Sequence, residues 1–170
     1  MKSLLLILVT VIFLTGCQES PTGRNRLALV PEAVLADMGQ ESFAQMKQQN
    51  AVITRPDINR LVQCITEALV SAAHTRYPDA PMPQSWEIAV FENATPNAFA
   101  LPGGKIGVHS GLLELAENQA QLATVIGHEI AHVLADHGNE RLTQELGLQA
   151  GMLLVGLFTE SEIAENQIQQ

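Results

Sequence analysis

The segment from Asn118 to Gly138 constrains the fold most strongly, because its apolar residues recur with the period of an α-helix. Asn118, with Gln121 three residues later, is typical of a capping box at a helix start, and Gly138 is typical of the residue just past a helix end. Five aliphatic side chains share one face: Leu122, Ile126, Ile130, Val133 and Leu134. The sequence therefore predicts a helix to His137 with one face in a core.

A second face of this helix carries the pentapeptide His128-Glu129-Ile130-Ala131-His132. Residues four apart on a helix are separated by only about 40° around its axis, so His128 and His132 project side by side and can chelate one ion. Zinc binds imidazole well, and catalytic zinc uses three protein ligands plus a water. Glu129 lies at the flank of the pair, where its carboxylate can act as general base on a zinc-bound water. We predict one Zn²⁺ per chain at this face.

The alternative interpretation makes the two histidines solvated or core residues of an ordinary amphipathic helix. They lie off the core stripe, and their face also holds small or polar residues: Gln121, Thr124, Ala131, Ala135 and Asp136. A merely solvated face would more often carry Lys and Glu. Asp136 is a candidate to orient His132 by a hydrogen bond, or else an exposed carboxylate without a role. His137 is predicted to point away from the pair, at a helix end that favours positive charge.

The rest of the chain predicts an α+β fold, mainly helical, with a small antiparallel sheet beside this helix. Helical spacing indicates one helix from Pro31 towards Gln49 and another capped by Asp57 and ending near His74. Strand patterns follow at residues 86–91, 97–101 and 105–109, and Pro102-Gly103-Gly104 between the last two is typical of a hairpin. Cys64, among apolar neighbours, is predicted to be a buried structural cysteine.

The N-terminus has the layout of a secretory signal, with Lys2 before an apolar run from Leu4 to Leu14. The run is too short to span a bilayer, which takes about 20 residues. Leu14-Thr15-Gly16-Cys17 resembles the bacterial lipobox, so we predict a signal peptide over residues 1–16, lipidation of Cys17, and a tether over residues 17–30. The other interpretation is an ordinary signal cleaved near Gly16. By the same resemblance, Gln18 after the cysteine indicates an outer-membrane lipoprotein facing the periplasm.

The formal net charge of −9 argues against nucleic acid as a partner, because nucleic-acid binding requires a basic surface. Residues 31–170 are long enough for one domain, which we predict to be a metallopeptidase domain.

Three stretches together resemble the HtpX and Ste-type family of zinc metallopeptidases: residues 97–106 (NAFALPGGKI), 110–113 (SGLL) and 125–132 (VIGHEIAH). The predicted lipobox, Pro21-Thr22-Gly23-Arg24 and Val62-Gln63-Cys64 resemble its outer-membrane lipoprotein branch, which includes LoiP and BepA. The resemblance implies a gluzincin fold and a substrate cleft lined by Asn97, Ala98 and Phe99. It further implies an envelope endopeptidase that acts on misfolded or unassembled outer-membrane and periplasmic proteins, with the outer-membrane assembly machinery as a candidate partner.

One departure from that family concerns the third zinc ligand, which in the family is a glutamate in a Glu-Ala-Asp context on a later helix. The sequence ends at Gln170 without such a motif, and Glu160 and Glu162 echo it only faintly. The resemblance therefore predicts a truncated form of a longer protease, with an apolar stretch from Leu146 to Phe158 that would make it prone to associate. The alternative function is a catalytically inactive lipoprotein that binds unfolded envelope proteins or an assembly partner.

Overall fold

The computed structural model describes residues 17–19 and 23–168, and the side chains of residues 23–153. Within these residues the elements follow one another in this order: β1 (Cys17–Glu19), β2 (Asn25–Leu27), α2 (Glu32–Gln49), α3 (Pro56–Arg76), β3 (Glu87–Phe91), β4 (Ala98–Leu101), β5 (Lys105–His109), α4 (Ser110–Leu115), α5 (Gln119–Leu134) and α6 (His137–Ile168). The predicted α+β class is confirmed.

The three strands β3, β4 and β5 form a mixed sheet in the order β3-β5-β4. β4 and β5 make the predicted hairpin, in which Gly103 and Gly104 adopt φ values of 76° and 74° that glycine tolerates best. β3 runs parallel to β5, so the prediction of a purely antiparallel sheet is wrong. The cause is the strand order. β5, the second strand of the hairpin, lies between β3 and β4, so β3 pairs with β5 and not with β4.

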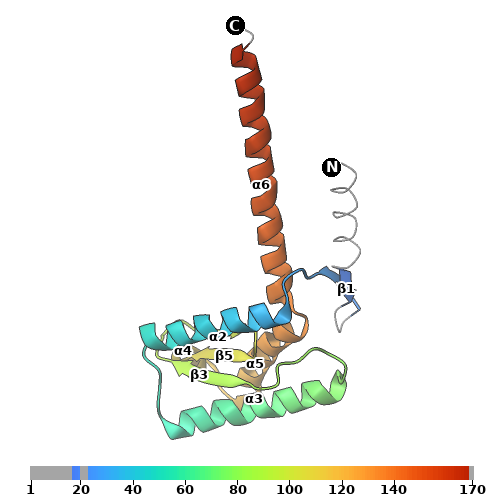
Figure 1. Cartoon of the computed structure of the whole chain (residues 1–170). Helices are drawn as coiled ribbons and strands as arrows, with labels where there is room; N and C mark the ends of the chain where they lie inside the picture. Colours follow the sequence, from blue (N-terminus) through green and yellow to red (C-terminus); the bar gives the residue numbers. More distant parts are fainter. Residues whose placement is uncertain (1–16, 20–22, 169–170) are drawn as a thin grey trace.

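Helices cover both faces of this sheet, as Figure 1 shows with α2 on one side and α3 on the other. Side chains alternate between the two faces as strand geometry requires. On the α3 and α5 side, the main core is built from residues of every layer, including Val62, Val90, Ile106, Val108, Ile126 and Ile130. On the α2 side, Phe43 and Phe91 meet edge to face with ring centroids 6.0 Å apart, and Phe99 packs beside them. The two-sided sheet thus holds α5 firmly in place.

Two details of the helices differ from the prediction. The N-cap of α3 is Arg55, with Pro56 at the first position, and the predicted cap Asp57 lies inside the first turn, where the helix dipole favours a carboxylate. Cys64 is exposed rather than buried, because the core face of α3 runs through Val62 and Ile65. Cys64 comes two positions after Val62, about 200° further around the helix axis, which places its side chain on the opposite side of the helix.

The chain from Arg24 to Val30, here called the strap, is bound along the start of α6. Arg24 pairs with Glu140, and the backbone N–H of Leu29 donates to Oγ1 of Thr143 over 3.1 Å. The side-chain amide of Asn139 makes two hydrogen bonds to the backbone of Val30. Its Oδ1 accepts from the N–H of Val30, and its Nδ2 donates to the carbonyl of Val30. Half of the segment predicted to be a tether therefore belongs to the folded body.

α6 leaves the body and projects away from it (Figure 1). Its described side chains include the exposed apolar residues Leu146, Leu148, Met152 and Leu153. In the part of the chain that the structure describes, no helix is long and apolar enough to cross a membrane. The predicted signal peptide of residues 1–16 and the side chains of Cys17, Glu160 and Glu162 lie outside the described residues.

Candidate metal centre

The helix α5 positions the two histidines of the predicted site, and its start is as the sequence indicates. Oδ1 of Asn118 accepts from the backbone N–H of Gln121 over 3.1 Å, which caps the helix. The side chain of Gln121 reaches back to the N–H of Glu117 rather than to that of Asn118, one residue earlier than a standard capping box. Leu122, Ile126, Ile130 and Leu134 are buried as predicted, so the face with the histidines is turned away from the core.

His128 and His132 converge at the ring nitrogens that would hold a metal. Their Nε2 atoms are 3.0 Å apart, and the rings meet edge to face with centroids 4.6 Å apart. Two imidazoles on one tetrahedral zinc, each about 2.05 Å from the ion, have nitrogens about 3.3 Å apart. The observed pair needs only a small opening to reach that spacing, so these two residues fit two of the three protein ligands of a catalytic zinc.

Among the described side chains, no group of three or more His, Cys, Asp or Glu residues is placed to hold a metal ion. The structure does bring together the two histidines His128 and His132. Glu129 is next to His128 on the same helix and is half-buried.

The end of α5 differs from the prediction, and the difference gives His132 a neighbour. The helix stops at Leu134, and Asp136, not Gly138, adopts the left-handed conformation with φ 53°. Asp tolerates this conformation better than most residues because its short polar side chain bonds locally. α6 then starts at His137, and the change in chain direction turns this ring back, so that its Nδ1 lies 2.5 Å from Nδ1 of His132. The prediction that His137 points away from the pair is wrong.

Asp136 lies beside His132 in the chain but contacts Arg26 of the strap. Nη1 of Arg26 is 3.2 Å from Oδ2 of Asp136 and also donates to the carbonyl of Ala135 over 2.5 Å. Burial raises the pKa of Asp136, although the charge of Arg26 acts in the opposite direction. Each residue of the predicted Asp136–His132 pair thus has a different neighbour in the structure. Arg26 is absent from the sequence-based site, because a single arginine in a polar stretch carries no signal.

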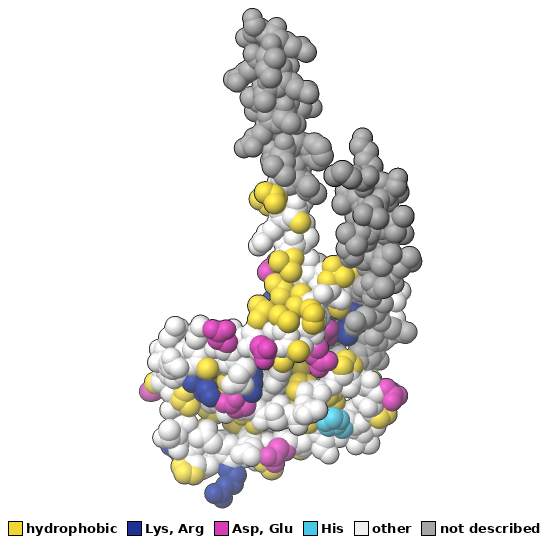
Figure 2. Space-filling model, viewed as in Figure 1, with side chains coloured by type: hydrophobic (Ala, Val, Ile, Leu, Met, Phe, Trp, Pro, Cys, Tyr) yellow, Lys and Arg dark blue, Asp and Glu magenta, His cyan; other side chains and the backbone are white. Residues whose placement is uncertain are grey.

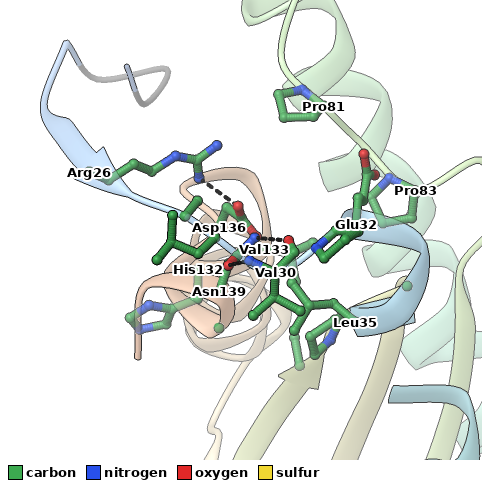
Figure 3. Close-up of a pocket in the computed structure, with 17 residues that line it drawn as sticks. Arg26, Val30, Glu32, Leu35, Pro81, Pro83, His132, Val133, Asp136 and Asn139 are labelled. Atoms are coloured by element: carbon green, nitrogen blue, oxygen red, sulfur yellow. Dashed lines mark hydrogen bonds and ion pairs between the residues drawn. The ribbon is translucent and has the colours of Figure 1, made fainter. Parts of the chain in front are cut away.

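A pocket of about 320 Å³ lies between the strap, α2 and the corner where α5 meets α6. Figure 3 shows Arg26 reaching Asp136 on one side of it, with Pro81 and Pro83 on the other. His132 contributes to the wall, while the imidazole in this view points away from the hollow. The pocket therefore lies behind the paired histidines rather than in front of them.

The strand β4 lies at the edge of the sheet and packs against α5. Ala98 is buried in the main core, Phe99 stacks on Phe91 with centroids 5.9 Å apart, and Asn97 is exposed. The carbonyl of Asn97 accepts from the backbone N–H of His109 over 3.0 Å. Bonding alternates along an antiparallel pair, so Phe99 and Leu101 continue the bonds to β5 and Ala98 and Ala100 direct their backbone groups to the open edge.

Residues 56–169 match peptidase family M48. The chain belongs to this family. Its members include metalloendopeptidases, as the names of the relatives below state, which confirms the predicted metallopeptidase family.

Relatives of this M48 chain come from mitochondria and from bacteria. The mitochondrial metalloendopeptidase OMA1 of Arabidopsis thaliana is 33% identical over 147 residues, which cover 85% of this chain and 29% of the relative. OMA1 of Saccharomyces cerevisiae is 29% identical over 144 residues, covering 79% and 42%. The beta-barrel assembly-enhancing protease of Escherichia coli is 30% identical over 100 residues, covering 59% and 19%. The chain spans less than half the length of each of these relatives, and the lipoprotein branch stays a prediction.

Proposed function

We propose that this chain is a zinc-dependent endopeptidase of the bacterial cell envelope. The observation that carries the proposal is the convergence of the His128 and His132 Nε2 atoms, 3.0 Å apart, on a helix that packs beside an edge strand. Membership of peptidase family M48 supports the same reaction class.

His128 and His132 would hold the ion through Nε2. When bound, zinc supplies Lewis acidity that polarises the scissile carbonyl and lowers the pKa of a coordinated water. Glu129 takes the proton of the attacking water and later returns a proton to the leaving amine. One carboxylate can serve both steps, because it is regenerated when the amine departs.

The edge strand offers a place for the peptide. An extended polypeptide can add to β4 as a further strand, with main-chain hydrogen bonds to the outward-facing groups of Ala98 and Ala100. Such bonds do not depend on the side chains of the substrate. This supports unfolded or unassembled polypeptides as substrates, a class that the name of the Escherichia coli relative, beta-barrel assembly-enhancing protease, also suggests.

The test is the Glu129→Gln variant of the full chain, loaded with zinc and given an unfolded polypeptide. Loss of a general base typically costs 10²–10⁴-fold in rate, so we expect cleavage to fall by at least about 100-fold while zinc content stays the same. Glu114→Gln, at an exposed position on α4, is the matched control and should cleave normally. If the zinc-loaded parent binds unfolded chains without cutting them, the inactive binding lipoprotein is the better description.

The envelope location rests on Cys17 and on the resemblance of its surroundings to a lipobox. Two or more acyl chains hold a protein stably at a membrane, whereas one does so only marginally. In a bacterial host, labelled palmitate should enter the parent chain and not Cys17→Ser. Labelling of both proteins, or of neither, would contradict the lipid anchor.

A further inference from the structure

His132, one of the two proposed metal ligands, also contacts His137, which is not a proposed ligand. Their Nδ1 atoms are 2.5 Å apart, and the ring centroids are 4.8 Å apart at 60°. Both rings are half-buried. His132 therefore uses both of its ring nitrogens, Nε2 towards His128 and Nδ1 towards His137.

The protons in this chain of rings can be assigned from the metal-binding role. A His132 side chain that binds zinc through an unprotonated Nε2 carries its ring proton on Nδ1. That N–H then donates to Nδ1 of His137, which accepts only if its own proton is on Nε2. A single arrangement thus satisfies the contact and leaves Nε2 of His132 directed at the ion. Metal-ligating histidines commonly donate their other ring N–H to an acceptor that fixes the tautomer.

We propose that His137 is a positioning residue that holds His132 in the Nδ1–H tautomer, with Nε2 turned to the metal beside His128. This inference rests on the proposed metal site. It assigns to a neutral imidazole the part that a carboxylate or a backbone carbonyl usually plays.

The corner between α5 and α6 keeps His137 in place. Asp136 makes the left-handed turn, and the backbone N–H groups of Asn139 and Glu140 donate to its carbonyl over 3.1 and 3.3 Å. Arg26, with a side chain only 3% exposed, donates to the carbonyl of Ala135 and so fixes the corner to the strap. The backbone from which the His137 ring projects is therefore held in place by the fold, and the ring lies half-buried against His132.

The direct test reads the tautomer of His132 in the full-length, metal-free protein. Long-range ¹H–¹⁵N correlation of the imidazoles, at about pH 8 where an ordinary histidine is neutral, distinguishes protonated from unprotonated ring nitrogens. We expect His132 to carry its proton on Nδ1 in the parent and in His137→Gln, whose side-chain oxygen can also accept. In His137→Leu the proton should redistribute towards Nε2. An Nε2–H tautomer in the parent, or an unchanged tautomer in His137→Leu, would overturn the proposal.

Zinc affinity gives a second readout. Loss of such an outer contact typically costs 10–100-fold in metal affinity, so competition with a chromophoric chelator should show about that loss in His137→Leu and recovery in His137→Gln. His74→Leu, on the exposed side of α3, controls for removal of an imidazole and should bind zinc as the parent does. Equal weakening in His137→Leu and His137→Gln would contradict positioning through Nδ1. If the tautomer shifts as expected but the parent takes up no zinc, the proposed function fails while the role of His137 in orienting His132 stands.

Discussion

Gly107 shows how the packing of neighbours dictates the identity of a single residue. It lies in the middle of β5, and a Cβ atom built on it would be 2.1 Å from Cζ of the Phe99 ring. That ring has little freedom to move, because it stacks on Phe91 and meets His109 edge to face. The glycine is required by the aromatic layer that covers it.

The variant Gly107→Ala should therefore destabilise the protein. Overpacking of this kind typically costs about 1–3 kcal/mol, and we expect a fall of that size in the free energy of unfolding measured with denaturant. Gly147→Ala, in an open position on α6, is the matched control and should leave stability unchanged or slightly raised. Equal effects of both variants would show that Phe99 does not confine Gly107.

At this scale the sequence predicted the residues that a helical period can place. His128, Glu129 and His132 share α5 with a buried stripe that was predicted almost residue for residue. His137 could not be placed, because a single residue, Asp136, takes the left-handed conformation and redirects the chain. Only the cluster of turn-forming residues Asp136, Gly138 and Asn139 hinted that the helix would break before His137.

The edge strand β4 is the element on which peptide binding would depend. A proline at position 98 removes an N–H that faces the open edge, and edge positions of this kind tolerate proline. We expect Ala98→Pro to raise the KM for an unfolded polypeptide while the protein still folds and retains zinc, with some loss of stability because Ala98 is buried in the main core. Phe99→Pro is the contrast, since it removes a bond to β5 and should lower the melting temperature further. Unchanged KM in Ala98→Pro would mean that the peptide binds elsewhere.

The strand β3 is tied to its neighbours by charge. Glu87 contacts Lys47 of α2 and Lys105 of β5, and the hydrogen bond from Lys47 is the main reason that its pKa is lowered from the usual 4.5. A lowered folded-state pKa gives stability that is fully present above the unfolded value and is lost as pH falls through the folded value.

The variant Glu87→Gln should consequently melt lower than the parent at neutral pH, and the two melting curves should converge as pH falls below about 4.5. The difference should be modest, because the Glu87 side chain is 36% exposed and solvent screens the pairs. Thermal unfolding across this pH range measures it, with Glu114→Gln as the exposed control. A constant difference between parent and variant at all pH values would exclude the ion pairs as its cause.

Elements were predictable where their pattern is local. The helices α2, α3 and α5 and the β4–β5 hairpin follow from periodicity and from turn glycines, and each was found within a few residues of its expected bounds. The parallel pairing of β3 with β5 was not predicted, because it depends on which side of the hairpin meets β3. Nothing in the pattern of either strand specifies that choice.

At the scale of the whole molecule, α6 carries apolar surface away from the body. Leu148 is 68% and Met152 is 73% exposed, and Figure 2 shows hydrophobic side chains gathered where the helix leaves the body. Exposed apolar patches of this kind favour association. We therefore expect the Cys17→Ser chain, which cannot be lipidated at that position, to self-associate, with a weight-average mass that rises with concentration in sedimentation measurements.

Replacing both residues, as Leu148→Glu with Met152→Glu, should reduce this association. Leu115→Glu, at a 63% exposed position on the body, is the matched control and should associate as the parent does. A parent that stays monodisperse at high concentration would contradict the expectation. The strap was equally out of reach of sequence reasoning, since its hydrogen bonds join residues more than 100 positions apart.

The strap also limits how far the metal-binding helix can work from a membrane. It is bound to the body from Arg24 onwards, and Cys17 lies seven positions before Arg24. β1 pairs with β2, which places Cys17 opposite Leu27 of the strap, and even a fully extended chain over seven positions, at about 3.5 Å per residue, would reach no further than roughly 25 Å. With Cys17 in the lipid, as proposed, the folded body of the protein would stay close to the surface of the bilayer. Polypeptides located at the membrane surface would then encounter the metal-binding helix far more often than polypeptides that diffuse freely away from the membrane.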